Sequence, residues 1–316
     1  MSQLREALDQ YVATRRALGS SFYEPALSLS HFLDFLDREQ ATRITTDLAL
    51  RWAMQPANVQ RATWARKLTH VRGFARWMAA IDDQTEVPPL GLLSARRRRN
   101  PPHIYTDEEI GSLLDQAAQL RSPSGMRALT YSTLIGLLTA TGLRPSEAFS
   151  LDNKDVDLVH GILSIRESKF GKSRFVPLHE SARAALERYA HARDKICPKP
   201  TGEAFLIGER GSRLVAGSAR SMFARLCRTI GLRPTRPDER DGFGPRLQDF
   251  RHTFATRRMV QWYREGKDAA LELPKLATYL GHVEVGLTYW YIEAVPELLQ
   301  HAGQYLGRPK SVGDRL

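Results

Sequence analysis

Apolar residues recur at three- and four-residue steps between residue 2 and about residue 78, with polar and charged residues between them. The segments HFLDFLDRE (31–39) and WARKLTHVRGFARWMAA (64–80) show this pattern most clearly. Such spacing places the apolar side chains on one face of a helix. We therefore expect the first part of the chain to be a small helical domain.

A second region of helical pattern begins near residue 106. Thr106 and Glu109 have the spacing of a capping box, which marks the start of a helix. A longer apolar helix is expected over MRALTYSTLIGLLTAT (126–141), and it should end at Gly142, a residue suited to the left-handed conformation that follows many helices.

Residues 156–178 alternate β-branched and polar residues around two turns that contain Gly161 and Gly171. This alternation is typical of three short strands joined by turns. Helical patterns then return and continue to a polar C-terminal tail. The expected fold class is mainly α with a small antiparallel β-sheet, in which a helical domain is followed by a mixed α/β domain.

Between the two helical regions lies VPPLGLLSARRRRNPPHIYT (87–106), whose prolines interrupt any helix. Its arginine run is most often a solvated linker, but in a basic chain it can also lie along a DNA backbone. The run consists of Arg96, Arg97, Arg98 and Arg99. The expected domains are residues 1–90 (helical, DNA-binding), 91–105 (basic linker), 106–306 (catalytic) and 307–316 (flexible tail).

Composition narrows the class of partner. The chain has 316 residues, a formal net charge of +11 and a pI near 9.9, which favours polyanions and above all nucleic acid. The helical segment 64–80 adds Arg66, Lys67 and Arg72 as candidate DNA contacts. The sequence contains no run of about 18 apolar residues, the length that a membrane-spanning helix needs. Cys197 and Cys227 are the only cysteines and suggest neither a zinc site nor a disulfide framework, so we expect a cytoplasmic protein.

Three motifs carry candidate chemistry. TGLRPSEAFSL (141–151) places Arg144 between two helices, LQDFRHTFATRRM (247–259) places Arg251 on a helix, and LGHVEVGLTYWYIEA (280–294) follows a Gly-His pair with two tyrosines. Alone, each has an ordinary explanation: a surface arginine beside a capping carboxylate, an amphipathic helix, and aromatic residues that fill a core.

Their joint order, with a lysine-bearing hairpin SKFGKSRFVPL (168–178) between the two arginines, resembles the tyrosine recombinase (phage integrase) family. The resemblance extends over residues 106–294, and the N-terminal domain is similar only in architecture to the family's core-binding domain. It implies a two-domain DNA clamp that cleaves and rejoins DNA through a 3′-phosphotyrosyl intermediate without a cofactor or metal. The implied partners are a double-stranded recombination site and other protomers in a tetrameric synapse, with a partner recombinase as a further candidate; the implied location is the bacterial nucleoid.

The resemblance also assigns roles to residues. Arg144 and Arg251 would bind the non-bridging phosphate oxygens, as planar guanidiniums do well. His282 would hydrogen-bond the phosphate, and Tyr291, nine residues later, would be the nucleophile. Tyr289 stands two residues short of that position and is expected to pack or to contact DNA.

Lys169 aligns with the family's hairpin lysine and is the candidate general acid, with Lys172 as its rival and otherwise a DNA contact. Glu147 and Asp249 are expected to orient the arginines rather than to transfer protons. Gln248 departs from the family pattern, which usually has His at that place, and an amide cannot transfer a proton at neutral pH. His252 could substitute for it.

Two alternatives stay open. A type IB topoisomerase uses the same chemistry but nicks and reseals a single duplex. A non-cutting architectural or regulatory member of the family would bind DNA without cleaving it, and Gln248 is the feature that supports this alternative.

Overall fold

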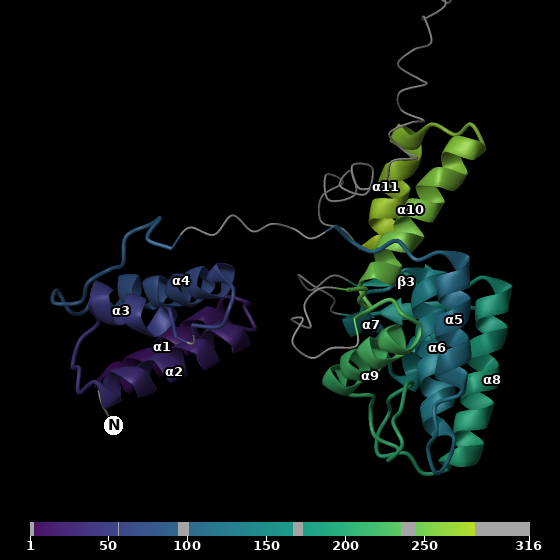
Figure 1. Ribbon diagram of the computed structural model, residues 1–316, viewed down its shortest axis with the longest axis horizontal. Coiled ribbons are helices and arrows are strands. Elements are labelled where there is room, and N and C mark those ends of the chain that lie inside the picture. Colours follow the sequence, from purple (N-terminus) through teal and green to yellow (C-terminus); the bar gives the residue numbers. More distant parts are fainter. Residues whose placement is uncertain (1–2, 56, 94–100, 167–172, 235–243, 282–316) are drawn as a thin grey trace, which may run out of the picture. The chain divides into compact units, whose positions relative to one another are not determined.

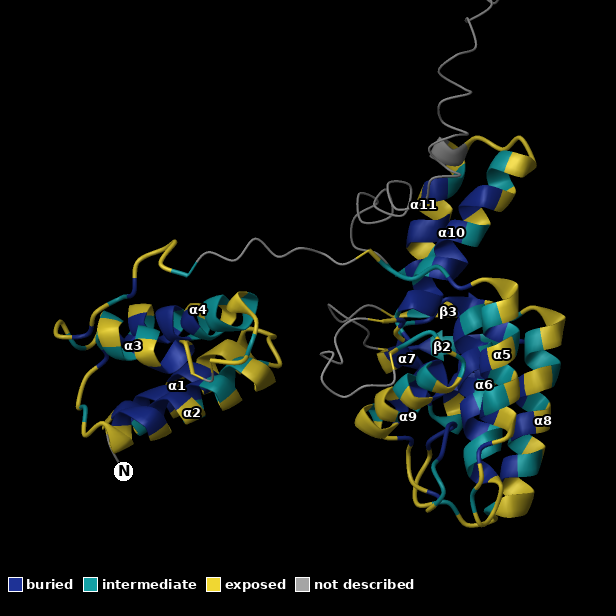
Figure 2. Cartoon of the chain, in the orientation of Figure 1, coloured by how far each residue is buried: buried dark blue, intermediate teal, exposed yellow. Residues whose placement is uncertain are grey.

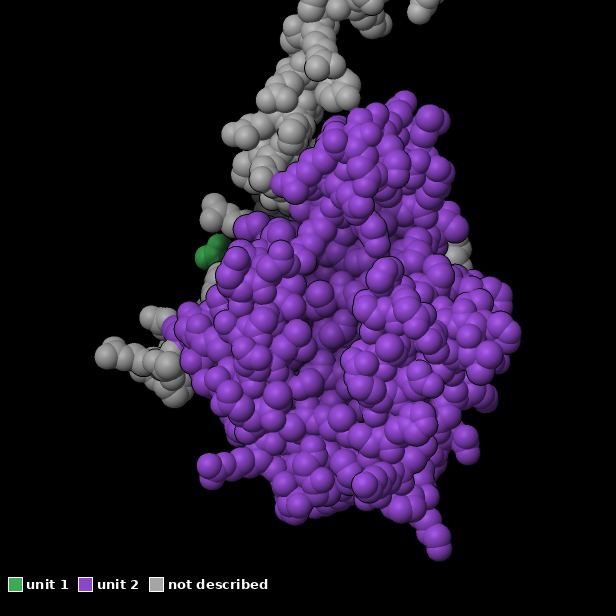
Figure 3. Space-filling model, turned by 90° about the vertical axis from the view of Figure 1, so that its right-hand side faces the viewer, with its two compact units in different colours: residues 1–100 green, residues 101–316 purple. Residues whose placement is uncertain are grey.

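The computed structural model describes residues 3–55, 57–93, 101–166, 173–234 and 244–281, and all structural statements below refer to these. The chain divides into two compact units, residues 1–100 and residues 101–316 (Figures 1 and 3). In the described part of the chain, no helix has the length and apolar content that crossing a membrane requires.

Unit 1 is built from helices, as its sequence pattern predicts. They are α1 (Gln3–Ala17), α2 (Tyr23–Arg38), α3 (Thr46–Ala53) and α4 (Arg61–Met78). The apolar positions of segments 31–39 and 64–80 meet in one core. Helix α2 contributes Phe32 and Leu36 to it, and α4 contributes Val71 and Phe74. Figure 2 shows these buried faces directed toward the interior of the unit.

Unit 2 combines helices with one small sheet. Its helices are α5 (Asp107–Ala118), α6 (Met126–Thr141), α7 (Pro145–Ser150), a 3-10 turn (Asn153–Asp155), α8 (Glu180–Ile196), α9 (Ala216–Thr229), α10 (Asp249–Arg264) and α11 (Ala269–Leu280). The strands β1 (Val156–Asp157), β2 (Ile162–Ile165) and β3 (Arg174–Pro177) pair antiparallel in the order β1-β2-β3. Leu163 pairs with Val176 and Ile165 pairs with Arg174. The predicted fold class is confirmed.

The apolar helix α6 runs through the core of unit 2 and packs against α5, α8 and α10 (Figure 1). Leu134 and Leu138 on α6 are completely buried. The predicted capping box at the start of α5 is confirmed: the Thr106 hydroxyl accepts from the Glu109 amide at 3.1 Å, and Glu109 accepts from the Thr106 amide at 3.0 Å.

The end of α6 determines where the first arginine motif begins. Gly142 adopts the predicted left-handed conformation, with φ of 61°. A Cβ atom there would lie 2.6 Å from Phe254 Cδ1 on α10, closer than carbon atoms can approach. Only glycine fits, so α6 stops at this residue and α7 starts three residues later.

Candidate active site

Arg144 immediately precedes α7 and is held by a carboxylate from the first turn of that helix. Pro145 occupies the first helical position, and Glu147 accepts from the Arg144 backbone amide at 2.9 Å and from its Nη1 at 2.8 Å. The Arg144 side chain is 20% exposed, whereas that of Glu147 is buried. Glu147 therefore fixes a guanidinium that still reaches solvent.

The same carboxylate binds a second arginine, which the sequence reasoning missed. Arg174 at the start of β3 donates from Nη1 to Glu147 Oε1 at 3.0 Å and from Nη2 to Oε2 at 2.9 Å. The available signal was the arginine at position 174 in the hairpin segment SKFGKSRFVPL. Its side chain thereby links the first residue of β3 to the first turn of α7.

Two opposing effects set the pKa of Glu147. Burial alone would raise the pKa, but hydrogen bonds and charges from Arg174 and Arg144 outweigh it, so the pKa lies below its usual value. Glu147 is therefore ionised at neutral pH and acts as an acceptor, as expected for a residue that orients arginines.

Arg251 reaches the same region from α10, as the order of motifs predicts, but it lies inside the protein. It is 1% exposed. Its Nη1 donates to the Gly142 carbonyl at 3.1 Å and its Nη2 to the Leu280 carbonyl at 2.5 Å. The guanidinium thus joins the ends of α6 and α11, a structural role that the sequence reasoning did not anticipate.

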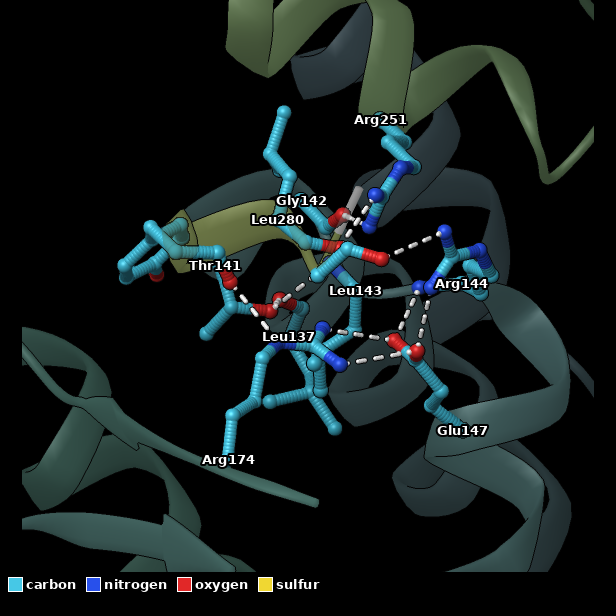
Figure 4. A network of polar contacts seen from close by, with 11 residues as sticks. Leu137, Thr141, Gly142, Leu143, Arg144, Glu147, Arg174, Arg251 and Leu280 are labelled. Carbon is cyan, nitrogen blue, oxygen red and sulfur yellow. Dashed lines mark hydrogen bonds and ion pairs between the residues drawn. The ribbon is translucent and has the colours of Figure 1, made fainter. Parts of the chain in front are cut away.

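Three arginines meet at the last residues of α11 (Figure 4). Arg174 Nε donates to the Tyr279 carbonyl at 2.7 Å, and Arg251 Nη2 donates to the next carbonyl, at Leu280. Arg144 Nη2 donates to the Gly281 carbonyl at 3.2 Å. Helix C-terminal carbonyls carry partial negative charge, so cations are favoured there. The chain is thereby fixed up to residue 281, directly before His282.

We call Arg144, Glu147, Arg174 and Arg251 the arginine cluster. Glu147 binds the guanidiniums of Arg144 and Arg174, while Arg251 binds main-chain carbonyls, so the cluster has three guanidiniums and one carboxylate and positive charge is in excess. Guanidiniums form charge-assisted, geometrically specific hydrogen bonds with phosphate oxygens. The cluster is therefore suited to an anion, and a phosphodiester matches the basic character of the whole chain.

The other residues of the second motif have different surroundings. Asp249 is buried and accepts from the Arg246 amide at 2.8 Å and from Arg246 Nη2 at 3.0 Å, so it orients Arg246; that it also orients Arg251 stays a prediction. Gln248 precedes α10 and its side chain makes no capping hydrogen bond. Burial lowers the pKa of His252 to about 4, so at neutral pH this imidazole is uncharged and poorly suited to donate a proton.

Several predicted site residues lie outside the described residues. These are the hairpin lysines, the residues after α11 and the arginine run: Lys169, Lys172, His282, Tyr289, Tyr291, Arg96, Arg97, Arg98 and Arg99. A further tyrosine, Tyr279, is described. Its ring stacks on Phe254 at 5.5 Å, and burial raises its pKa to about 12, which identifies it as a packing residue.

The candidate DNA contacts of unit 1 differ in how accessible they are. Arg66 is 58% exposed and pairs with Glu24 at 3.2 Å. Lys67 donates to the Trp52 carbonyl at 2.9 Å and lies over the Trp52 ring. Arg72 is buried, and its Nε and Nη2 donate to the Pro88 and Pro89 carbonyls. Of the three, Arg66 is the most available to a phosphate, and the burial of Arg72 does not support its predicted DNA contact.

Comparison with known proteins gives matches over most of the chain. Residues 104–297 match the model of the Phage integrase family. The integrase/recombinase homologue y4rB of Sinorhizobium fredii is 42% identical over 312 residues, which cover 98% of each chain. The tyrosine recombinase XerC of Corynebacterium glutamicum is 28% identical over 231 residues, which cover 73% of this chain and 67% of XerC.

Solved structures show the same fold at low sequence identity. The Tn1549 transposon integrase in complex with transposon right-end DNA has a TM-score of 0.64 and 17% identity, covering 96% of this chain and 99% of that one. A lambda integrase dimer bound to a COC' core site has a TM-score of 0.61 and 18% identity, covering 91% of this chain and 76% of that one.

Proposed function

Because this chain belongs to the phage integrase family of tyrosine recombinases, we propose that it cleaves and rejoins DNA at a specific site through a phosphotyrosine formed on Tyr291. One observation in the structure supports this most: three arginines from separate elements bind the carbonyls of residues 279, 280 and 281, directly before the His of the Gly-His pair. The motifs that are distant in sequence are adjacent in the fold.

In the proposed reaction the Tyr291 hydroxyl loses its proton and attacks the scissile phosphorus. A bond forms between the tyrosine oxygen and phosphorus, the bond from phosphorus to the 5′ oxygen breaks, and that oxygen takes a proton, for which Lys169 is the candidate donor and Lys172 its rival. A 5′ hydroxyl then reverses the step. The energy of the phosphodiester is conserved throughout, so the reaction needs no nucleotide.

In this proposal Arg144 and Arg251 stabilise the negative charge that develops on the non-bridging oxygens in the transition state. Arg144 is the better placed of the two, since its guanidinium reaches solvent while Arg251 is buried between helix ends. Gln248 can still donate a hydrogen bond to a phosphate oxygen, but it cannot transfer a proton at neutral pH. Burial lowers the pKa of His252 to about 4, which argues against His252 as the acid that substitutes for the usual His.

The proposed partners are a DNA duplex and further copies of the chain. The solved relatives include an integrase bound to transposon DNA and an integrase dimer on a core site. With the excess of basic residues, we propose that the protein assembles on its recombination site and is located with the bacterial chromosome.

A nicked "suicide" substrate tests the nucleophile. DNA flanking the gene would be sequenced for inverted repeats or an attachment site, and a labelled duplex carrying that site and a nick near the scissile phosphate would be incubated with protein. Wild type and Tyr289→Phe should form a protease-sensitive covalent adduct, whereas Tyr291→Phe should bind DNA but form none, because only the hydroxyl is lost.

Two outcomes would contradict this assignment. An adduct that persists in Tyr291→Phe and disappears in Tyr289→Phe would show that Tyr289 is the nucleophile. Wild-type protein that binds its site without forming any adduct would support the non-cutting alternative. Recombined junctions between two sites, rather than relaxed single duplexes, would distinguish a recombinase from a topoisomerase.

A further inference from the structure

We infer that Arg174 is a positioning residue for strand cleavage: by binding both oxygens of Glu147, it keeps the guanidinium of Arg144 directed toward the scissile phosphate. This inference rests on the proposed function. Arg174 itself is not placed at the phosphate, because each of its three guanidinium nitrogens already donates to a protein acceptor.

The geometry of Arg174 uses the whole planar guanidinium. Nη1 and Nη2 bind the two carboxylate oxygens of Glu147, and Nε binds the Tyr279 carbonyl at 2.7 Å. The side chain is only 11% exposed. A lysine ammonium is a point charge without this fork, so it cannot make all three bonds with the same directions.

Glu147 in turn depends on Arg174 for its charge balance. Its two oxygens accept from Arg174 at 3.0 and 2.9 Å, and from Arg144 Nη1 and the Arg144 amide at 2.8 and 2.9 Å. One carboxylate shared by two guanidiniums leaves one net positive charge. Without Arg174, Arg144 would be the one remaining guanidinium bound to Glu147. The carboxylate would then neutralise its charge and draw it away from an incoming phosphate.

Arg174 also lies directly against the residue that precedes His282. A Cβ atom at Gly281 would be 2.9 Å from Arg174 Nη1, and Gly281 has φ of +67°. Arg174 therefore links β3, of which it is the first residue, to the first turn of α7 and to the end of α11. Its loss would release all three from one another.

The test compares single-turnover adduct formation by wild type, Arg174→Ala and Arg174→Lys on the suicide substrate. We expect Arg174→Ala to slow adduct formation about a hundredfold, as small misplacements of reacting groups do, and Arg174→Lys to remain at least about tenfold slower than wild type. The Kd for DNA should change little, because binding is distributed over many cations.

A second substrate separates positioning from general damage. Replacing one non-bridging oxygen of the scissile phosphate by a methyl group removes the charge that Arg144 would neutralise. On this neutral methylphosphonate the rate ratio of wild type to Arg174→Ala should fall toward one, as it should for Arg144→Ala. A ratio that is the same on both substrates, or a variant as fast as wild type on ordinary DNA, would overturn the inference.

Arg193→Ala is the matched control. Arg193 is similarly buried and binds Asn153 Oδ1 at 2.6 Å and the Phe205 carbonyl at 2.9 Å, while its Nε pairs with Asp194. Arg193→Ala should lower the stability of the protein. The ratio of its adduct-formation rates on ordinary DNA and on the methylphosphonate should equal that of wild type. If Arg174→Ala does not fold, Arg174→Lys decides the question on the same two substrates. Absence of an adduct from wild type would instead contradict the proposed function.

Discussion

Arg144 and Arg251 have the same assigned role at the phosphate, yet they differ in what their removal would leave behind. Arg251 is buried and satisfies the Gly142 and Leu280 carbonyls, whereas Arg144 is partly exposed beside Glu147. We expect both alanine variants to lose adduct formation. Arg251→Ala should also lose about 2 to 6 kcal/mol of unfolding free energy, because each of the two buried acceptors left unpaired costs about 1 to 3 kcal/mol.

Urea denaturation of the two variants, followed by circular dichroism, measures this difference. Arg144→Ala should unfold close to the wild-type midpoint and still bind DNA. If Arg251→Ala unfolded at the wild-type midpoint, its contacts with the helix ends would not contribute to stability and the buried position would need another explanation.

At the residue scale, local contacts could be predicted and distant ones could not. The pairing of Glu147 with Arg144 follows from their three-residue spacing at a helix start. The pairing of Glu147 with Arg174 joins residues 27 apart, and no local rule connects them. For the same reason the burial of Arg251 was missed, since it depends on where the ends of α6 and α11 come together.

The end of α11 is the element whose geometry matters most to the site. Gly281→Ala should lower the unfolding free energy by about 1 to 2 kcal/mol, the usual cost of a left-handed non-glycine residue. It should also slow adduct formation, because the new Cβ would lie 2.9 Å from Arg174 Nη1 and displace it. Thermal unfolding and single-turnover cleavage measure the two effects.

Gly136→Ala provides a control of opposite sign. Gly136 lies inside α6, and a Cβ there meets nothing within 4 Å. The substitution should stabilise the protein by about 0.5 to 1 kcal/mol, because alanine favours a helix interior over glycine. A Gly281→Ala variant as stable and active as Gly136→Ala would show that the end of α11 tolerates a side chain.

Elements with strong local signals were predicted well. The helices of unit 1, the capping box of α5, the end of α6 and the three strands all follow from periodicity and turn residues. The arrangement of α10 and α11 around the arginine cluster depends on packing between Phe254, Leu276 and Leu280, which periodicity does not specify.

For the whole molecule, the net charge of +11 predicts that DNA binding weakens steeply with salt. Each phosphate contact that is lost should reduce the slope of log K against log salt by about 0.9. Arg66→Ala should reduce the slope in this way. Arg72→Ala should chiefly lower the thermal stability of unit 1, since its guanidinium binds the Pro88 and Pro89 carbonyls. Fluorescence anisotropy at several salt concentrations measures the slopes.

The same titration tests the arginine run. Replacing Arg96, Arg97, Arg98 and Arg99 by alanine should weaken binding to all sequences alike, because contacts with the DNA backbone carry no sequence information. Loss of discrimination between sites with overall affinity unchanged would assign these residues to base recognition instead.

The arginines at the end of α11 bind main-chain carbonyls, and this has a consequence for how the protein can evolve. Carbonyl groups are the same in every residue, so the identities of residues 279 and 280 are constrained by packing alone, whereas Arg144, Arg174, Arg251 and Gly281 are constrained by the contact itself. A library randomised at positions 279 and 280 should therefore retain many active clones with different apolar pairs. A library randomised at any of the three arginines should retain almost none.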